Sequence, residues 1–125
     1  MNDSSVERVS PFACRMDAIE ADKRPQHIAT AKHLFSSASE IKELSNGYAF
    51  RLPNESEVLL KVAEFISLER LCCPFFDFTL EVEREGGSIW LHLTGREGVK
   101  PFIRAEIGEF LNGGDHFVKL GKSTD

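Results

Sequence analysis

Hydrophobic residues change their spacing twice in the first half of the chain. Over residues 23–38 they recur at three- and four-residue steps, which is typical of a helix with one buried face. The spacing falls to two on both sides of the turn signal Asn46-Gly47, which predicts a β-hairpin. Helical spacing returns over 55–73 and stops before Pro74, because the residue before a proline disfavours helical backbone. The apolar positions of the first helix are Ile28, Ala31, Phe35 and Ala38.

The second half of the chain repeats the order of hairpin and helix. Apolar and polar residues alternate on both sides of Gly86-Gly87, which predicts a second hairpin. A helical pattern then begins near Thr94 and Glu97 and reaches Leu111. The expected fold class is therefore α+β, in the order α-ββα-ββα: two ββα units form a four-stranded antiparallel sheet whose apolar face three helices cover. The apolar positions of the second hairpin are Phe76, Phe78, Leu80, Val82, Ile89, Leu91 and Leu93.

A chain of 125 residues has the length of one domain with one hydrophobic core. We expect residues 1–12 to form a loose N-terminal arm, 13–114 the single α+β domain and 115–125 a C-terminal tail. The outer face of the predicted sheet would carry Phe75 and Trp90. A half-apolar outer face is often a contact between subunits, so a homodimer is one interpretation, and scattered exposed aromatic residues on a monomer are the other.

The charge and the cysteine content exclude several classes of function. The chain carries 15 Lys and Arg against 20 Asp and Glu, a net charge of −5, and no stretch gathers basic residues, which argues against nucleic-acid binding. No apolar run approaches the ~18 residues that cross a bilayer, and no signal peptide is evident. Three cysteines, two of them adjacent, do not form the even framework of a secreted protein. We expect a soluble cytoplasmic protein without a membrane partner.

One polar residue breaks the apolar face of the second predicted helix. On a helical wheel, Glu69 lies near the centre of the apolar stripe and between Cys72 and Cys73. An unpaired buried carboxylate is unfavourable, so Glu69 needs a proton, a cation such as Arg70 or Lys32, hydrogen-bond donors or a metal ion. A structural Glu with such partners and a functional ligand beside two thiols both fit this position. The other residues of the stripe are Val58, Val62, Phe65 and Ile66.

The adjacent cysteines predict a site for a soft ion. Cys72 and Cys73 cannot easily form a disulfide with each other, because a bridge between neighbouring residues is strained. Their two thiolates, with Glu69 and with Cys14 if the N-terminal segment folds back, would suit a thiophilic metal or metalloid such as Hg, As or Zn. We therefore expect a binding protein rather than an enzyme. Three histidines are further candidate ligands that the sequence does not place: His27, His33 and His92.

Two other functions fit the same cysteines. In a thiol redox protein or enzyme, Cys72 or Cys73 would be oxidised or would attack a substrate, and Cys14 would resolve the product. The negative end of a helix dipole opposes thiolate formation at this place, which disfavours that alternative. In a structural or interaction domain the cysteines only pack, since free cysteine is often buried as a small hydrophobic residue. The binding and redox interpretations share one expectation, namely that the partner is a metal ion or a small thiol-reactive ligand.

Residues 69–76 read E-R-L-C-C-P-F-F. They resemble a group of small bacterial proteins that share an E-R-x-C-C-P-F signature. The likeness extends along much of the chain, to Phe12-Ala13-Cys14, Leu80-Glu81-Val82 and Ile89-Trp90-Leu91. The resemblance implies no particular reaction, but it favours a thiol site over cysteines that only pack.

Overall fold

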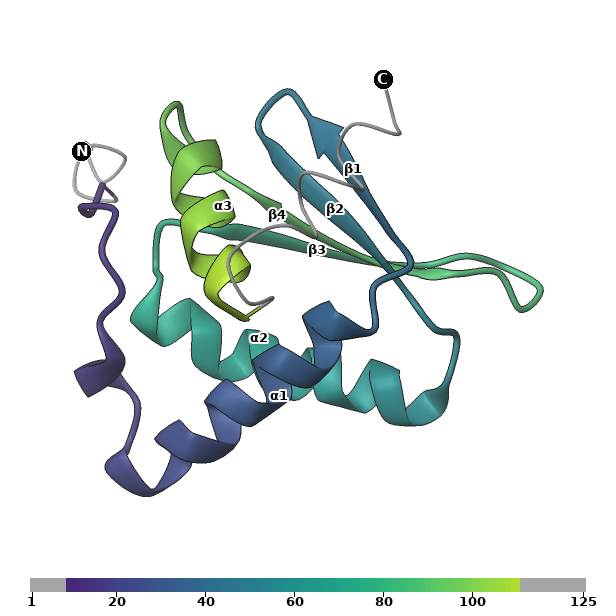
Figure 1. Cartoon of the computed structure of the whole chain (residues 1–125), viewed down its shortest axis with the longest axis horizontal. Coiled ribbons are helices and arrows are strands. Elements are labelled where there is room, and N and C mark those ends of the chain that lie inside the picture. The colour runs from purple at the N-terminus through teal and green to yellow at the C-terminus, as the bar shows by residue number, and fades with distance from the viewer. Residues whose placement is uncertain (1–8, 111–125) are drawn as a thin grey trace, which may run out of the picture.

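The computed structural model describes residues 9–110, and its elements follow the predicted order (Figure 1). The predicted α+β fold, with a four-stranded antiparallel sheet and three helices, is confirmed. Among the described residues no helix is long and apolar enough to cross a membrane. The elements are two 3₁₀ turns, Met16–Ala18 and Ala21–Lys23, then α1 (Arg24–Ser36), β1 (Glu40–Leu44), β2 (Gly47–Leu52), α2 (Ser56–Cys72), β3 (Asp77–Val82), β4 (Ile89–Thr94) and α3 (Val99–Phe110).

The four strands pair in the order β1-β2-β4-β3, and every pair is antiparallel. The two predicted hairpins therefore join through β2 and β4 in the middle of the sheet. The register places Ile41, Phe50, Leu91 and Leu80 side by side. The first three of these are fully buried. Successive side chains of a strand point to opposite faces, so the alternation in the sequence gives the sheet one apolar face.

Aromatic rings dominate the core between the sheet and the helices. Phe35 of α1 packs edge-on against Phe50 of β2, with 4.9 Å between ring centroids, and against Phe65 of α2 at 5.4 Å. Such ring pairs add about 1 kcal/mol each to the stabilisation from burial. The three rings belong to one buried cluster that also includes Ile103 and Ile107 of α3. All three helices thus cover the same face of the sheet (Figure 1).

The apolar face of the sheet extends beyond the helices at strand β3. Leu80 and Val82 share the predicted face, but 38% and 52% of their surfaces stay exposed. Within residues 9–110, strand β3 lies at an edge of the sheet and pairs only with β4. Its contact with α2 is made by Phe78, which packs against Phe65 at 6.5 Å. Alternation in the sequence predicts which way a side chain points, but not whether a helix lies over it.

The outer face of the sheet carries many charged residues. Trp90 is largely buried there because the ammonium group of Lys42 lies 4.9 Å from its ring and Glu83 accepts a hydrogen bond from its indole Nε1 at 3.2 Å. The prediction that Phe75 shares this face is wrong. Phe75 lies in the loop between α2 and β3 and packs against Phe102 of α3 at 5.0 Å. Of the two aromatic residues predicted for a homodimer contact, only Trp90 lies on this face.

The turns of the two hairpins differ from their sequence signals. In the second hairpin, positive φ angles occur at Glu85 (60°) and Gly86 (77°), one position before the predicted pair Gly86-Gly87. In the first hairpin, Gly47 begins β2 without a positive φ. A Cβ atom on Gly47 would lie 2.0 Å from the carbonyl oxygen of Leu93. Glycine is needed here because strand β4 approaches closely, not because of the turn conformation.

Helix α3 begins at Val99, and Pro101 lies in its first turn. Proline is tolerated there because the first amides of a helix have no partner within the helix. The predicted helix end at Leu111, the domain boundary at 114 and the tail over 115–125 lie outside the described residues, as do residues 1–8 of the predicted arm.

Candidate metal centre

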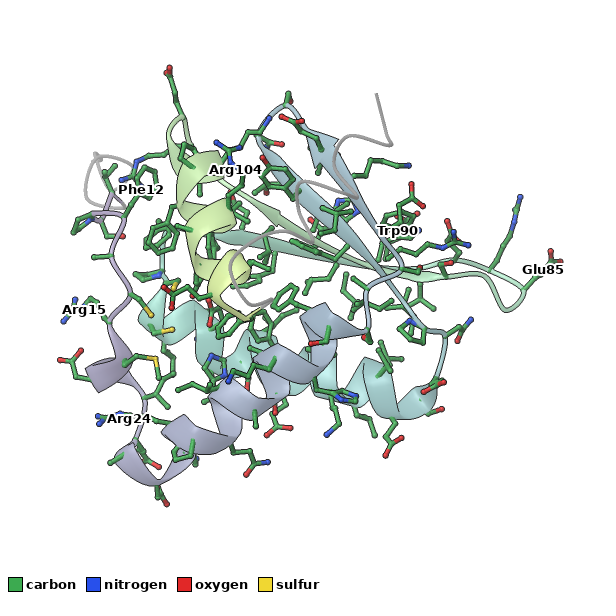
Figure 2. All side chains as sticks on the ribbon, viewed as in Figure 1. Phe12, Arg15, Arg24, Glu85, Trp90 and Arg104 are labelled. Carbon is green, nitrogen blue, oxygen red and sulfur yellow. The ribbon has the colours of Figure 1, made fainter. Side chains whose placement is uncertain are left out.

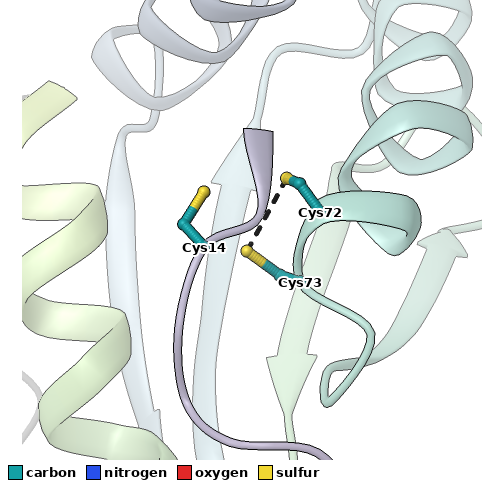
Figure 3. A group of neighbouring side chains, drawn as sticks. All are labelled: Cys14, Cys72 and Cys73. Atoms are coloured by element: carbon teal, nitrogen blue, oxygen red, sulfur yellow. Dashed lines mark hydrogen bonds between the residues drawn. The ribbon is translucent and has the colours of Figure 1, made fainter. Parts of the chain in front are cut away.

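Cys72 and Cys73 lie where helix α2 ends against the core. Cys72 is the last residue of α2, and the amide of Cys73 still donates a hydrogen bond to the carbonyl oxygen of Glu69 at 2.8 Å. Both cysteines are fully buried, and their Sγ atoms lie 3.8 Å apart in a thiol–thiol hydrogen bond (Figure 3). Both are free thiols, as expected from the strain of a disulfide between neighbours.

The N-terminal segment brings a third thiol to this pair. The amide of Arg15 donates a hydrogen bond to the carbonyl oxygen of Cys72 at 2.8 Å, which fixes the segment against the end of α2. The Sγ atoms of Cys14, Cys72 and Cys73 lie within 4.8 Å of one another. Figure 3 shows Cys14 on the segment that runs past the pair, and Cys14 is the exposed member of the three. The structure therefore brings together the three cysteines that the sequence singled out.

Aromatic contacts hold the N-terminal segment in place. The ring of Phe12 packs edge-on against Phe75 at 5.1 Å and stacks with Phe102 of α3 at 6.3 Å. The guanidinium group of Arg96 lies 4.0 Å from the centre of the same ring, a favourable cation–π geometry. Gly98, with a φ of 99°, leaves room for the ring, since a Cβ atom there would lie 2.9 Å from it. Figure 2 shows Phe12 beside α3, so the segment that carries Cys14 is tied to both α2 and α3.

Glu69 is buried as the helical wheel predicts, with 1% of its surface exposed. Its partner is His27 of α1, whose Nε2 lies 2.8 Å from Oε1 of Glu69. Arg70 and Lys32, the cations considered from the sequence, are exposed. Sγ of Cys72 lies 3.5 Å from the same Oε1, close enough for a hydrogen bond when Cys72 is protonated. A histidine, a carboxylate and a thiol from two helices therefore form one continuous polar group inside the core.

A second carboxyl group, from Glu106 of α3, also contacts the cysteine pair. The thiol of Cys73 donates a hydrogen bond to Oε2 of Glu106 at 3.6 Å. Ligand atoms of Glu69, Cys73 and Glu106 lie within 4.8 Å of one another, and so do those of His27, Glu69 and Cys72. Buried polar atoms normally have partners. Among the described residues three atoms of this cluster have none: Nδ1 of His27, Oε2 of Glu69 and Oε1 of Glu106.

The pKa values of His27 and Glu69 move apart in the direction that favours an ion pair. Burial by itself lowers the pKa of His27, but hydrogen bonds and negative charge from Cys72 and Glu69 outweigh it and raise the pKa to about 9. Burial by itself raises the pKa of Glu69, but hydrogen bonds from His27 and Glu106 outweigh it and lower the pKa below its ordinary value. At neutral pH the pair is therefore an imidazolium next to a carboxylate.

The three thiols of the cluster differ strongly in acidity. The hydrogen bond from Cys73 does most to lower the pKa of Cys72, which falls to about 6 in spite of burial and with help from His27. The pKa of Cys73 rises well above its ordinary value because of its hydrogen bond with Cys72 and its burial. Burial, followed by the charge of Cys72, raises the pKa of Cys14 to about 12. Cys72 is thus the thiolate of the cluster at neutral pH, although it ends a helix whose dipole opposes that charge.

Glu106 is the neutral acid of the cluster. Burial, followed by the negative charge of Glu69, raises the pKa of Glu106 to about 10. Two carboxyl groups this close cannot both ionise readily in a poorly hydrated place, so one of them keeps its proton. Counted at neutral pH, the cluster holds one imidazolium, one carboxylate and one thiolate. Its net negative charge favours a cation, and further thiols would release protons as they bind one.

The cluster lines a pocket of about 530 Å³ that is open to solvent. Its polar lining comes from Cys14, His27, Glu69 and Glu106 of the cluster and from the charged residues Lys32 and Glu109, whereas Cys72 and Cys73 lie behind it and do not line it. Figure 2 shows sulfur atoms gathered between the N-terminal segment and α2, below α3. An ion or small molecule that enters this pocket therefore meets Cys14 before it meets the buried pair.

Sequence reasoning named His27 as one of three candidate ligands that it did not place, and it did not name Glu106. The apolar face predicted for the first helix included Ile28, which is 39% exposed. The buried face is rotated so that it includes His27, which precedes Ala31 by one helical turn. A wheel centred on Ala31 and Leu34 would have revealed it. Glu106 lies next to the fully buried Ile107 of α3, and the sequence analysis did not extend the helical wheel to this helix.

Comparison of the chain with protein-family models, with curated proteins and with solved structures gave no match. The function is therefore argued from the geometry of the cluster itself.

Proposed function

We propose that the chain binds a soft metal or metalloid ion, of the type of Hg(II) or As(III), through Cys14, Cys72 and Cys73. The proposal depends on one observation, the three Sγ atoms within 4.8 Å of one another. Thiolates are soft ligands that select soft ions. Free thiols persist in reducing compartments, so the proposal also places the chain in the cytoplasm.

The composition of the ligand groups favours such an ion over Zn(II). Structural zinc sites have four ligands in a tetrahedron. Among the described residues, the group that holds all three thiols contains no fourth ligand within 4.8 Å of every other member. Glu69, predicted as a ligand, groups with Cys72 and with Cys73 but not with Cys14. We propose that Glu69 lies beside the bound ion without bonding it. Its carboxylate would hold the His27 imidazolium close to the thiolate of Cys72.

Titration of the reduced protein with Hg(II), arsenite, Zn(II) and Cu(I) tests this proposal. We expect one equivalent of Hg(II) or arsenite to bind, followed through thiolate-to-metal absorption. The double variant Cys72→Ser/Cys73→Ser should lose the stoichiometric absorption change, and Cys14→Ser should weaken arsenite binding by about tenfold or more, because a three-thiol site becomes a two-thiol site. Ser67→Ala, on the exposed face of α2, is the control. Absence of stoichiometric binding, or binding unchanged in the double variant, would contradict the proposal.

A reactive thiol is a second candidate function, and a specific observation favours it. The pKa of Cys72 is lowered to about 6, chiefly by the hydrogen bond from Cys73 and with a contribution from His27. A thiolate at neutral pH is the nucleophilic form of cysteine. Cys14 lies close enough to act as the resolving thiol of a redox protein or enzyme. In this alternative, Cys72 attacks a peroxide and becomes a sulfenic acid while the peroxide is reduced to water or an alcohol. Cys14 then attacks the sulfur of Cys72, a Cys14–Cys72 disulfide forms, and the sulfenic oxygen leaves as water.

Alkylation with iodoacetamide is expected to be fastest at Cys72, and its rate should rise with pH through a midpoint of about 6. The His27→Gln variant should show a higher midpoint, because it removes a donor that stabilises the thiolate. His33→Gln, at an exposed position of the same helix, should match the wild type. The modified residue is identified from peptide fragments that separate the adjacent cysteines. A midpoint like that of an ordinary thiol, or one unmoved by His27→Gln, would exclude an activated Cys72.

A further inference from the structure

The walls of the pocket beside the thiols are mainly apolar, and Lys32 and Glu109 are the charged residues that line it outside the polar cluster. Met16 from the N-terminal segment, Ile28 from α1, and Phe102, Ala105 and Phe110 from α3 line it together with the polar cluster. A bare ion bound by three sulfur atoms makes no use of such walls. Pockets lined by hydrophobic and aromatic side chains, with a few polar groups at one place, are typical of sites for small organic molecules.

The size of the pocket also exceeds what an ion requires. Its volume is about 530 Å³, whereas an apolar cavity of about 150 Å³ already accepts a benzene molecule in another protein. Contact between an aromatic ring and the thioether of Met16 or the rings of Phe102 and Phe110 would be favourable. The thiol of Cys14 lines the same pocket, so a group attached to an atom on this sulfur points into an apolar space.

We propose that the site binds trivalent arsenic that carries one aryl group, with arsenic on Cys14 and one of the adjacent cysteines and the aryl ring in the pocket formed by Met16, Phe102 and Ala105. The inference rests on the proposed function, because it assigns a ligand class to the same thiols. Arsenic with one organic substituent forms bonds to two sulfur atoms and keeps its third direction for the substituent. A mercury ion with one organic substituent binds a single sulfur in a linear arrangement and would leave the other thiols unused.

Binding exchanges ligands on arsenic without any change of oxidation state. Phenylarsine oxide has one oxygen and one phenyl group on As(III). Each of the two thiols forms an arsenic–sulfur bond and gives up its proton, both arsenic–oxygen bonds break, and the oxygen leaves with the two protons as one water molecule. With arsenite, three cysteine sulfurs replace three hydroxyl groups, which leave as three water molecules; Cys14 and Cys73 supply two of the protons, and solvent supplies the third because Cys72 is already a thiolate. No oxidant or reductant takes part in either exchange.

Ala105 provides a variant that separates the aryl ring from the thiols. It is an exposed residue of α3 that lines the pocket, so a larger side chain there narrows the pocket without entering the core. In the full-length reduced protein, Ala105→Phe should weaken the binding of phenylarsine oxide by about tenfold or more, because the new ring occupies the space of the phenyl group. Arsenite binding should change by less than about threefold, because the thiols are untouched. Calorimetric titration measures both affinities.

Ala63→Phe is the matched control. Ala63 is an exposed residue of α2 that does not line the pocket, and neither affinity should change in this variant. If Ala105→Phe leaves the binding of phenylarsine oxide unchanged, or weakens both arsenic compounds equally, the assignment of the pocket to an aryl group is wrong while the thiol site stands. If the wild type binds neither compound, the thiol site and the aryl assignment are both wrong.

Discussion

Replacement of Glu69 by alanine is expected to lower the free energy of unfolding by about 3 kcal/mol in metal-free buffer, because it leaves the buried His27 without its counter-charge. The His27 Nε2 atom lies 2.8 Å from the carboxylate, and both side chains are almost fully buried. Urea unfolding of the wild type and the variant measures the difference through the shift of the midpoint.

The control for this measurement lies on the same helix. Glu64 accepts an exposed hydrogen bond from Gln26 at 3.0 Å, and Glu64→Ala should change the free energy of unfolding by less than about 0.5 kcal/mol, as surface substitutions usually do. Glu69→Gln should fall between the two, because an amide still pairs with His27 but carries no charge. Equal urea midpoints for Glu69→Ala and Glu64→Ala would mean that the carboxylate of Glu69 contributes nothing to stability.

Gly47→Ala is expected to lower the free energy of unfolding by about 3 kcal/mol, for steric reasons. A Cβ atom at this position would lie 2.0 Å from the carbonyl oxygen of Leu93, so the two central strands β2 and β4 must separate at the end where Gly47 pairs with Thr94. Gly86→Ala is the comparison, since Gly86 has a φ of 77° and open space around it. It should cost about 1 kcal/mol, the strain of a left-handed backbone alone. A smaller loss in the free energy of unfolding for Gly47→Ala than for Gly86→Ala would show that β2 and β4 move apart at little cost.

The periodicity of the sequence predicts the fold because apolar residues keep a regular spacing through the helices and strands. Helical spacing places α1 and α2 to within a few residues of their observed bounds, and alternation places all four strands. The errors have local causes. Strict alternation with Phe76 and Phe78 predicts Phe75 on the outer face of the sheet, yet the chain after Pro74 turns first and buries that ring against α3. The alternation of apolar and polar residues does not by itself show where a loop ends and a strand begins.

The sequence predicts the proximity of only those site residues that lie on the same helix. Glu69, Cys72 and Cys73 lie on α2, so their proximity follows from helix geometry. His27, Cys14 and Glu106 come from three other segments, and their approach depends on how α1, the N-terminal segment and α3 pack on α2. That packing is set by tertiary contacts, such as Phe12 against Phe102 at 6.3 Å. No spacing within the sequence encodes such contacts.

The backbone hydrogen bond from Arg15 to Cys72 holds Cys14 next to the end of α2. An ion bound there could therefore cross-link two segments that lie far apart in the sequence. Cys72 and Cys73 are neighbours, so an ion held by these two alone closes no loop. An ion that also bonds Cys14 would close the chain from position 14 to position 72, a loop that contains α1, β1, β2 and α2. A cross-link over a loop of this order restricts the unfolded chain and stabilises the folded one by about 4 kcal/mol. None of the three cysteines is in a disulfide, so bound arsenic would be a reversible cross-link. Small thiols that compete for arsenic would remove it, and the free energy of unfolding would fall as their concentration rises.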